Sequence, residues 1–476
     1  MMRSMVEQTA VVTQAYRYAL DPTPAQARQL ANFAGAARVA HNRMLAWVKA
    51  DLELGRWERQ LLGGRLEPAQ GWSLAALRKT WNANKDVWAP WWTEVSKEAF
   101  NTGLAQLADG LKNWSESRTG VRAGRAVGFP KLKSRARTKP SVAFTTGAIR
   151  VGDDRHSVTL PRLGRIRVQE NTRKLHRRIA NGTARILRAT CTRDGSGRWH
   201  VALTVVVQRR LGPPGHVRRH HSGVGVDVNC GDLVAATPDG REVMRIRAPR
   251  ALRDAQQRLG RLQRTAARQT NGSKRRNKTL AAIGRTHART AHVRRDALHK
   301  ATTTLAQSYD VVVVEDLNVA GMLARKHGLG ARGRGFNRAI ADASFATVRR
   351  LLGYKTGWYG SQLIVADRWY PSSKTCSGCA ARKPSLHLPQ RQYDCTACGA
   401  SVDRDLNAAI NLARLATAQA GPSTRSGRED ANSGQREVGE TDTAQAVDAR
   451  FDDLSTPHHH PVGQTGTATR QRVAAA

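Results

Sequence analysis

The stretch DVVVVEDL, residues 310–317, decides the fold class of this chain of 476 residues. Its four consecutive valines predict a strand that is buried on both faces, because a half-exposed strand would alternate apolar and polar residues. Strands of this kind lie in α/β sheets that helices cover on both sides. The run ends on Glu315, so a carboxylate is expected at the end of a central strand.

Two further acidic residues stand within or at the start of other expected secondary-structure elements. Asp227 lies inside VGVDVN, the first strand of an expected hairpin over residues 224–240, and Asp405 opens the expected helix DLNAAINLARLA. Three carboxylates gathered by strands and a flanking helix suit two-metal phosphodiester hydrolysis, because Mg²⁺ prefers oxygen ligands and a substrate phosphate completes its shell. Taken singly, each acid also has a structural explanation. Asp227 could serve a turn, Glu315 could form an ion pair, and Asp405 could cap its helix.

Four of the six cysteines form two close pairs between Glu315 and Asp405. The pairs are Cys376-Ser-Gly-Cys379 and Cys395-Thr-Ala-Cys398, with fifteen residues between them. This spacing predicts two knuckles that hold one structural Zn²⁺ in a tetrahedral site. A redox role is disfavoured, because neither pair opens a helix that follows a strand.

Other residues of the cysteine segment fit a small zinc-held module. Gly378 and Gly399 are expected to supply the backbone angles that knuckle turns need, and Tyr393 is expected to pack against the ribbon. The two remaining cysteines, Cys191 and Cys230, are expected to be reduced, packed thiols.

The charge of the chain predicts a polyanionic partner. Lys and Arg number 78 against 37 Asp and Glu, which gives a net charge of +41. A GC-rich genome that encodes Arg cheaply is the alternative explanation for part of this surplus. The sequence contains neither a secretory signal nor an apolar run long enough to span a bilayer, so we expect a cytoplasmic protein that associates with the nucleoid and not with membranes.

The remaining sequence suggests several units. AVVTQAYRYAL alternates as a half-buried strand does, and Thr23 before a proline predicts the start of a helical region that runs to about residue 115. A basic loop over 128–141 leads into short strands up to residue 210, for which a small antiparallel barrel is the simplest packing. Residues 250–308 are strongly basic and helical, with a break at 271–273.

The chain beyond residue 415 has a different composition. Residues 416–476 are rich in small and polar residues and contain six Arg, no Lys and eight acidic residues. Little apolar periodicity is present, so this tail is expected to be disordered. The run His458–His460 falls within it and is not assigned to a metal.

Four segments of the chain resemble a known family. GVGVDVNCGDLVAAT, YDVVVVEDLNVAGM, WYPSSKTCSGC and CTACGASVDRDLNAAINLA are similar to the three split RuvC-type motifs and the interposed zinc ribbon of transposon-encoded TnpB proteins. The related miniature type V CRISPR effectors share these motifs. The resemblance extends in kind and order over residues 12–415, including the segments YRYALDPTPAQARQLANFAGAARVAHN, GFPKLKSRAR and RRDALHKATTTLAQSYD.

The resemblance implies a multidomain fold of α/β and β units. These are a wedge-type antiparallel β-barrel, a helical recognition domain, a split RNase H-like RuvC nuclease domain, an inserted zinc ribbon and a disordered tail. The barrel is expected over residues 1–20 and 141–210, and the recognition domain over 21–140. The nuclease domain is expected over 221–370 and 401–415, the ribbon over 371–400 and the tail over 416–476.

The resemblance also implies an RNA-guided DNA endonuclease with guide RNA and double-stranded target DNA as partners. Asp227, Glu315 and Asp405 match the family's catalytic acids, which bind two Mg²⁺ ions. Asp405 is preferred to Asp403 because the family pattern places the acid before x-N-A-A.

Two asparagines near these acids bear on the match. Asn407 is expected to support the acidic site. Asn229 stands where many members have Gly, so a different local turn is expected. All three acids are present, so cleavage is still expected.

In such proteins the basic surface holds a guide–target heteroduplex by its backbone, and the protein reads only a short duplex motif directly. For Arg38 and Asn42, an exposed polar edge of a helix is the alternative explanation. For His299, packing within a helix is the alternative. The candidate contacts are Arg38, Asn42, Lys131, Lys133, Arg294, Arg295, His299 and Lys300.

Three other functions share part of this pattern. A miniature CRISPR effector would take its guide from a repeat array, and a non-cleaving RNA-guided repressor would have lost one acid. A transposase would also use three acids on an RNase H-like fold, although the ribbon and barrel disfavour it. The intact trio favours a cutting enzyme.

Overall fold

The computed structural model describes most of the chain up to residue 419. The described residues are 9–64, 66, 71–145, 147–213, 217, 219–229, 232–247, 251–324, 345–387 and 390–419. Cys230, the expected disordered tail from residue 420 and its histidine run lie outside them. No helix within the described ranges combines the length and the apolarity that a membrane span needs.

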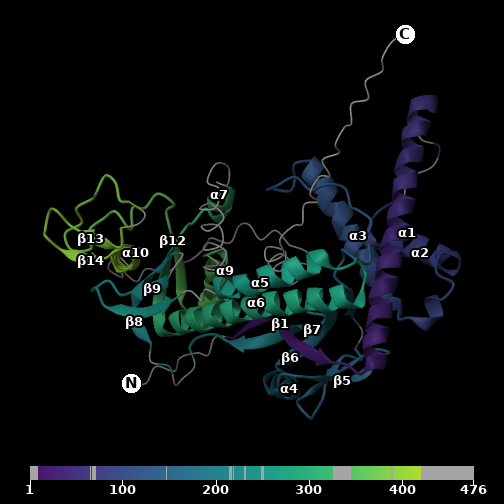
Figure 1. The fold of residues 1–476 in the computed structure, drawn as a ribbon, viewed down its shortest axis with the longest axis horizontal. Coiled ribbons are helices and arrows are strands. Elements are labelled where there is room, and N and C mark those ends of the chain that lie inside the picture. Colours follow the sequence, from purple (N-terminus) through teal and green to yellow (C-terminus); the bar gives the residue numbers. More distant parts are fainter. Residues whose placement is uncertain are drawn as a thin grey trace, which may run out of the picture. The chain divides into compact units, whose positions relative to one another are not determined.

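The first sheet has seven strands in the order β2-β6-β7-β1-β5-β4-β3. Its strands β1, β5, β6 and β7 are labelled in Figure 1. The expected barrel is wrong, because the described strands form an open sheet with β2 and β3 at its edges. These edge strands have four and two residues, too few to close a ladder. The strand bounds are β1 Thr9–Asp21, β2 Ser141–Phe144, β3 Arg150–Val151, β4 Ser157–Leu160, β5 Gly164–Val168, β6 Ala184–Arg193 and β7 Trp199–Arg210.

The long first strand joins the two parts of this sheet. β1 pairs antiparallel with β7 from Thr9 to Ala19, and only its last two residues pair with β5. The N-terminal strand and the strands after residue 141 therefore share one sheet. A short helix, α4 Arg173–Ala180, connects β5 to β6.

The helical region between β1 and β2 begins at the predicted residue. Thr23 Oγ1 accepts the N–H of Gln26 at 3.2 Å, and Gln26 Oε1 accepts the N–H of Thr23 at 3.1 Å, which completes a capping box. The elements are α1 Pro24–Leu62, α2 Leu74–Trp88, the 3₁₀ turn η1 Trp92–Glu94 and α3 Lys97–Arg118.

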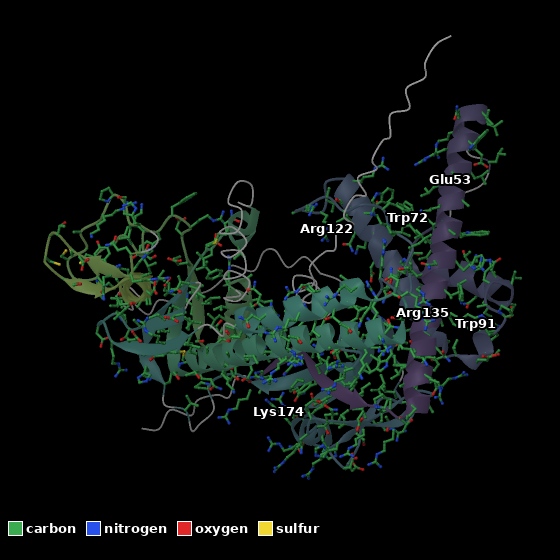
Figure 2. All side chains as sticks on the ribbon, viewed as in Figure 1. Glu53, Trp72, Trp91, Arg122, Arg135 and Lys174 are labelled. Atoms are coloured by element: carbon green, nitrogen blue, oxygen red, sulfur yellow. The ribbon has the colours of Figure 1, made fainter. Side chains whose placement is uncertain are left out.

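The tryptophans of this helical region pack at the edge of its core. Trp81 is buried, whereas Trp72 and Trp91, labelled in Figure 2, are half-buried and pack against the same core. Trp88 and Trp92 are also half-buried against this core, and half-buried Trp114 packs edge-on against Trp72 and Phe129, so these tryptophans form the margin of the core.

The second sheet has the strand order β10-β9-β8-β11-β12, with β11 parallel to both of its neighbours. The predicted central strand is confirmed, since Val312, Val313 and Val314 are at most 3 % exposed. The bounds are β8 His220–Val228, β9 Asp232–Ala236, β10 Glu242–Arg247, β11 Tyr309–Glu315 and β12 Gln362–Ala366. Strand β12 ends at Ala366, because the next residues form a turn.

Helices cover both faces of this sheet. Val312 and Val314 pack against α6 and α9, and Val313 packs against α10 on the opposite face. The predicted break in the basic helical stretch is confirmed, because Ser273 caps α6 by accepting the N–H of Arg276 at 3.2 Å. The helices are α5 Ala251–Arg268, α6 Lys274–Ser308, α7 Val319–Ala324, α9 Phe345–Tyr359 and α10 Arg404–Gln419, and a small pair of strands, β13 Gln392–Asp394 and β14 Ser401–Asp403, precedes α10.

Helix α10 lies directly on the backbone of β8 because two strand residues lack side chains. A Cβ atom on Gly225 would stand 2.0 Å from the carbonyl oxygen of Ala409, and one on Gly223 would stand 2.2 Å from Cβ of Ala416. Ala416 is 3 % exposed, so the expected end of the ordered chain at residue 415 is too early. Alanines give little apolar periodicity, yet they pack tightly against glycines.

Substitution of Gly225 by Ala should destabilise this layer. The new methyl group meets backbone atoms that cannot rotate away, and overpacking of this kind costs about 1–3 kcal/mol. We expect a lower melting temperature and faster hydrogen exchange in α10. Gly353→Ala is the matched control, since no atom lies within 4 Å of the added Cβ on this helical glycine, and it should raise stability slightly. Equal melting temperatures for the two variants would contradict the close packing.

Candidate metal centres

The structure brings the three predicted carboxylates together at one edge of the second sheet. Glu315 is the last residue of β11, Asp227 stands near the end of the adjacent parallel strand β8, and Asp405 lies in the first turn of α10. Asp227 is only 8 % exposed. We call these three residues the acidic centre.

The electrostatics of the acidic centre favour a bound cation. Burial, and then the charges of Glu315 and Asp405, raise the pKa of Asp227 well above its usual range. Burial also raises the pKa of Glu315 and of Asp405. Carboxylates withdrawn from water, with two of them acting on Asp227, offer the oxygen ligands that hard divalent ions prefer, so the residues fit Mg²⁺.

Several neighbouring residues interact with the acidic centre. The Ser372 hydroxyl donates a hydrogen bond to Glu315. Arg391 Nη1 lies 4.0 Å from Asp405 Oδ2, with the arginine side chain 67 % exposed and the aspartate 13 % exposed. The charge of Arg404 lowers the pKa of all three acids without cancelling the effect of burial.

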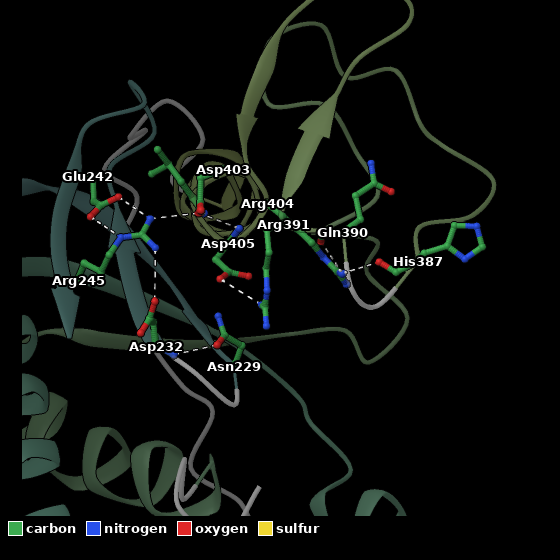
Figure 3. A network of polar contacts seen from close by, with 11 residues as sticks. Asn229, Asp232, Glu242, Arg245, His387, Gln390, Arg391, Asp403, Arg404 and Asp405 are labelled. Atoms are coloured by element: carbon green, nitrogen blue, oxygen red, sulfur yellow. Dashed lines mark hydrogen bonds and ion pairs between the residues drawn. The ribbon is translucent and has the colours of Figure 1, made fainter. Parts of the chain in front are cut away.

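Asp403 has a structural role that separates it from Asp405. Its Oδ1 accepts the N–H of Asp405 at 3.1 Å and of Leu406 at 2.9 Å at the start of α10, and it also accepts from Arg245 Nη2 at 3.1 Å. Figure 3 shows Arg245 reaching Glu242 as well, while Asp405 points towards Arg391. The geometry therefore favours Asp405 as the member of the centre.

Asn229 makes the turn after β8. Its Oδ1 accepts the N–H of Asp232 at 2.8 Å, and its own N–H donates to the carbonyl of Asp232 at 3.0 Å (Figure 3). The Asn229 amide beside Asp227 also lowers the pKa of that carboxyl group, against the larger effect of burial. These bonds join the end of β8 to the start of β9, two residues from Asp227.

The four predicted cysteines converge in a second centre. The Sγ atoms of Cys376 and Cys398 are 3.7 Å apart, those of Cys379 and Cys395 are 3.6 Å apart, and all four lie within 4.8 Å of one another. A tetrahedron of Zn–S bonds has edges of about 3.8 Å, so the sulfurs fit Zn²⁺. Backbone N–H groups of Cys398 and Ala397 lower the pKa of the Cys395 thiol, which favours the thiolate that zinc requires.

The two knuckles have the same backbone pattern. Cys376 and Cys395 each donate an N–H to the residue five positions later, and each accepts an N–H at its carbonyl from the residue four positions later. That fourth residue has a positive φ in both cases, 64° at Ala380 and 72° at Gly399. The expectation for Gly378 is wrong, since it is not among the positive-φ glycines and instead donates its N–H to the sulfur of Cys376 at 3.3 Å.

Tyr393 is the core of the ribbon, as predicted. It is 1 % exposed and packs with Cys376 and Cys395. Its hydroxyl lies 3.0 Å from the carbonyl oxygen of Lys374 and 3.3 Å from that of Ala381, so it links the two ends of the first knuckle.

Two buried asparagines of α10 hold the chain where it enters the ribbon. Asn407 Oδ1 accepts the N–H of Ser377 at 2.7 Å, and the amides of Asn407 and Asn411 both donate to the carbonyl of Thr375 at 2.7 Å. Asn411 also donates to the carbonyl of Ser372 at 2.8 Å. Asn407 therefore supports the ribbon rather than contacting the acids directly.

Sequence reasoning missed Ser372 and Asn411. The available signal was the pair of asparagines four residues apart in an otherwise apolar helix, because such a spacing places both amides on one buried face.

The candidate contacts on the first helix include one residue that is already engaged. The Asn42 side chain exchanges two hydrogen bonds with the backbone of Lys133, at 2.8 and 2.9 Å. The Lys133 ammonium group donates to Gln106, and burial lowers its pKa to about 8. Asn42 thus fixes the basic loop on α1, while Lys131 is exposed and Arg38 is half-buried.

The remaining candidates lie along α6. Lys300 is exposed and pairs with Asp296 at 2.7 Å. The carbonyl of His299 accepts a hydrogen bond from the buried Lys355 at 2.7 Å, whereas Arg294 and Arg295 are half-buried.

Family comparisons cover most of the chain. Family models described as "Helix-turn-helix domain", "Probable transposase" and "Cas12f1-like, TNB domain" match residues 9–53, 206–326 and 345–412. The "Putative RNA-guided DNA endonuclease" of Mycobacterium tuberculosis (strain H37Rv) is 43 % identical over 413 residues, which cover 84 % of this chain and 86 % of that protein. The chain belongs to the TnpB family.

Other TnpB family relatives and solved structures are more distant. The "Putative RNA-guided DNA endonuclease InsQ" of Escherichia coli (strain K12) is 27 % identical over 425 residues, which cover 87 % of this chain and 96 % of that protein. A cryo-EM structure of a Cas12f1–sgRNA–target DNA complex aligns with a TM-score of 0.42 and 12 % identity, covering 85 % of this chain and 99 % of that one.

Substitution of Gly399 by Ala should weaken zinc retention. The open surroundings of this residue leave backbone strain as the only penalty, about 1–2 kcal/mol for a left-handed residue with a side chain, or roughly 5- to 30-fold in zinc affinity. Gly378→Ala is the control, because its added Cβ meets nothing closer than 3.5 Å. Competition with a chromophoric chelator measures both affinities. A Gly378→Ala variant that lost zinc as readily as Gly399→Ala would contradict the assigned knuckle geometry.

Proposed function

We propose that this chain is an RNA-guided DNA endonuclease encoded by a transposable element, and that it hydrolyses target DNA at the acidic centre with two Mg²⁺ ions. The observation that carries the proposal is the meeting of buried Asp227 with half-buried Glu315 and Asp405, whose charges raise the pKa of Asp227, in a member of the TnpB family. The names of the curated relatives support an RNA-guided DNA endonuclease rather than a transposase.

The acidic centre would hold the metal ions through carboxylate oxygens. When bound, Mg²⁺ supplies an activated water and neutralises the leaving oxygen. The chain's own residues set the geometry: Ser372 orients Glu315 through its hydroxyl group, and Asn229 orients Asp227. Arg391, exposed beside Asp405, is placed to contact a phosphate of the bound strand.

The basic units would hold the guide RNA and its DNA partner by their backbones. Residues 21–140 and the first sheet form the proposed recognition part, and residues 221–370 with 401–419 form the nuclease part. Among the candidate contacts, Arg38, Lys131, Arg294, Arg295 and Lys300 act on phosphates, and Asn42 and Lys133 act by fixing the basic loop.

The four-cysteine ribbon, residues 371–400, is proposed as a structural zinc module. All four positions around the ion are filled by sulfur, which leaves no place for a reacting water. Its support of the acid site is mechanical, through the asparagines of α10.

Asp227→Asn should abolish cutting while leaving target binding intact. The amide keeps the size of the carboxylate but removes a charged ligand, so we expect at least a 100-fold loss of Mg²⁺-dependent cleavage of a guide-matched duplex. Gel-shift assays on the same guide complex should give an unchanged dissociation constant. Asp239→Asn, an exposed acid in the turn after β9, is the control. Full cleavage by Asp227→Asn would refute the mechanism.

The chain beyond α10 should be dispensable for cutting. Deletion of residues 421–476, with guide RNA supplied separately, should leave the cleavage rate within about twofold of the full chain. Deletion of residues 416–476 removes Ala416 from its packing against Gly223 and should lower the melting temperature and the rate together. Loss of cutting on the shorter deletion would show that the tail contributes to the protein's activity.

A further inference from the structure

Trp369 is a large apolar side chain left in solvent beside the acidic centre. It is 82 % exposed, although tryptophan loses more than any other side chain by remaining in water. A single exposed hydrophobic residue is common on protein surfaces, so the surroundings of Trp369 have to show whether it binds a ligand.

The turn that carries Trp369 is held by several hydrogen bonds. The Trp369 N–H donates to Asp367 Oδ1 at 2.8 Å, and the Tyr370 N–H donates to the carbonyl of Asp367 at 3.0 Å. The Tyr370 hydroxyl donates to the carbonyl of Asn411 at 3.0 Å, and the Ser372 N–H donates to the carbonyl of Tyr370 at 2.9 Å. The indole therefore extends from a fixed backbone.

This turn lies at the same sheet edge as the acids. Glu315 pairs with Ala366 in the parallel ladder, so the residues after Ala366 leave the sheet next to Glu315. Arg368 binds Asp316 at 2.7 Å, and Ser372 donates to Glu315. Trp369 stands between these two anchors, three residues from Ser372, so its backbone is within about 10 Å of that serine.

The charges around the turn indicate the chemistry of the ligand. Arg368 and Arg349 flank the turn through their shared partner Asp316, with side chains 48 % and 52 % exposed, and Arg391 is exposed beside the acidic centre. An apolar protein partner would not require cations here. A strand with phosphates for the arginines and a flat base for the indole fits both features.

We propose that Trp369 is a base-stacking platform that holds one unpaired nucleotide of the DNA strand entering the acidic centre. The inference rests on the proposed endonuclease function and deepens it, because it states that the strand presented to the acids is single-stranded, with one base stacked on the indole. A paired base would have its faces covered by its neighbours in the duplex and could not stack on Trp369.

An abasic-site scan of the displaced strand, which does not pair with the guide, tests the contact. Single abasic sites are placed at each of the two nucleotides on either side of the mapped cut, and single-turnover cleavage rates are compared. Stacking on an aromatic side chain is typically worth a factor of about ten or more in affinity. The wild-type protein should lose about tenfold at one position, and Trp369→Ala should be insensitive there.

Two variants complete the scan. Trp369→Phe keeps an aromatic face and should keep the position-dependent loss. Trp57→Ala removes another exposed tryptophan, 66 % exposed on α1, and should keep the wild-type pattern. A Trp369→Ala variant as sensitive to the abasic site as the wild type, or a wild type with no sensitive position, overturns the proposal.

Photo-crosslinking gives a readout that is independent of cutting. In the Asp227→Asn complex, 5-iododeoxyuridine at the sensitive position should crosslink on irradiation to a peptide that contains Trp369, and a crosslink confined to another peptide overturns the proposal. The endonuclease mechanism and the stacking platform can be tested separately. If Asp227→Asn cuts like the wild type, the endonuclease mechanism fails, whereas if it is inactive and Trp369→Ala behaves as wild type, only the stacking platform fails.

Discussion

The close contact of α10 with β8 is the constraint on which the nuclease part depends. Gly223 and Gly225 remove two side chains from the strand, so that the helix backbone reaches the sheet at Ala409 and Ala416. A side chain at either glycine would meet the helix within about 2 Å and push it away from the strand. Asp405, at the N-terminal end of the same helix, is thereby held close enough to raise the pKa of Asp227.

The acids near this contact fall into two classes. Asp316 follows Glu315 directly and is paired with two arginines, which lower its pKa, and Asp403 precedes Asp405 and is paired with Arg245. The acidic centre itself receives one hydroxyl donor, one side-chain amide and a 4.0 Å contact with an arginine. Arginine pairing thus neutralises the structural acids and leaves the acidic centre with fewer cationic partners, a division that burial alone would not produce.

Sequence patterns predicted the features that depend on residues close together in the chain. The valine run fixed the central strand, the cysteine spacing fixed the ribbon, and Thr23 fixed the start of α1. The barrel was wrong because closure depends on pairings between distant strands, and the left-handed residue of the first knuckle was misplaced because Ala380 adopts an angle for which alanine gives no signal. The family pattern predicted Asp405 rather than Asp403, and the hydrogen bonds of Asp403 give the physical reason.

The position of the ribbon between the second and third acids has a mechanical consequence. The chain leaves the sheet after Ala366, forms the cysteine cluster and returns as α10, so a misfolded ribbon would displace both Ser372 and the helix that carries Asp405. Asn407 and Asn411 join these parts by donating to one carbonyl, that of Thr375, next to the first cysteine. Because buried amides without partners are costly, the ribbon and α10 are most stable when both are in place. Folding of the cysteine cluster and placement of the last carboxylate are therefore coupled through the same hydrogen bonds.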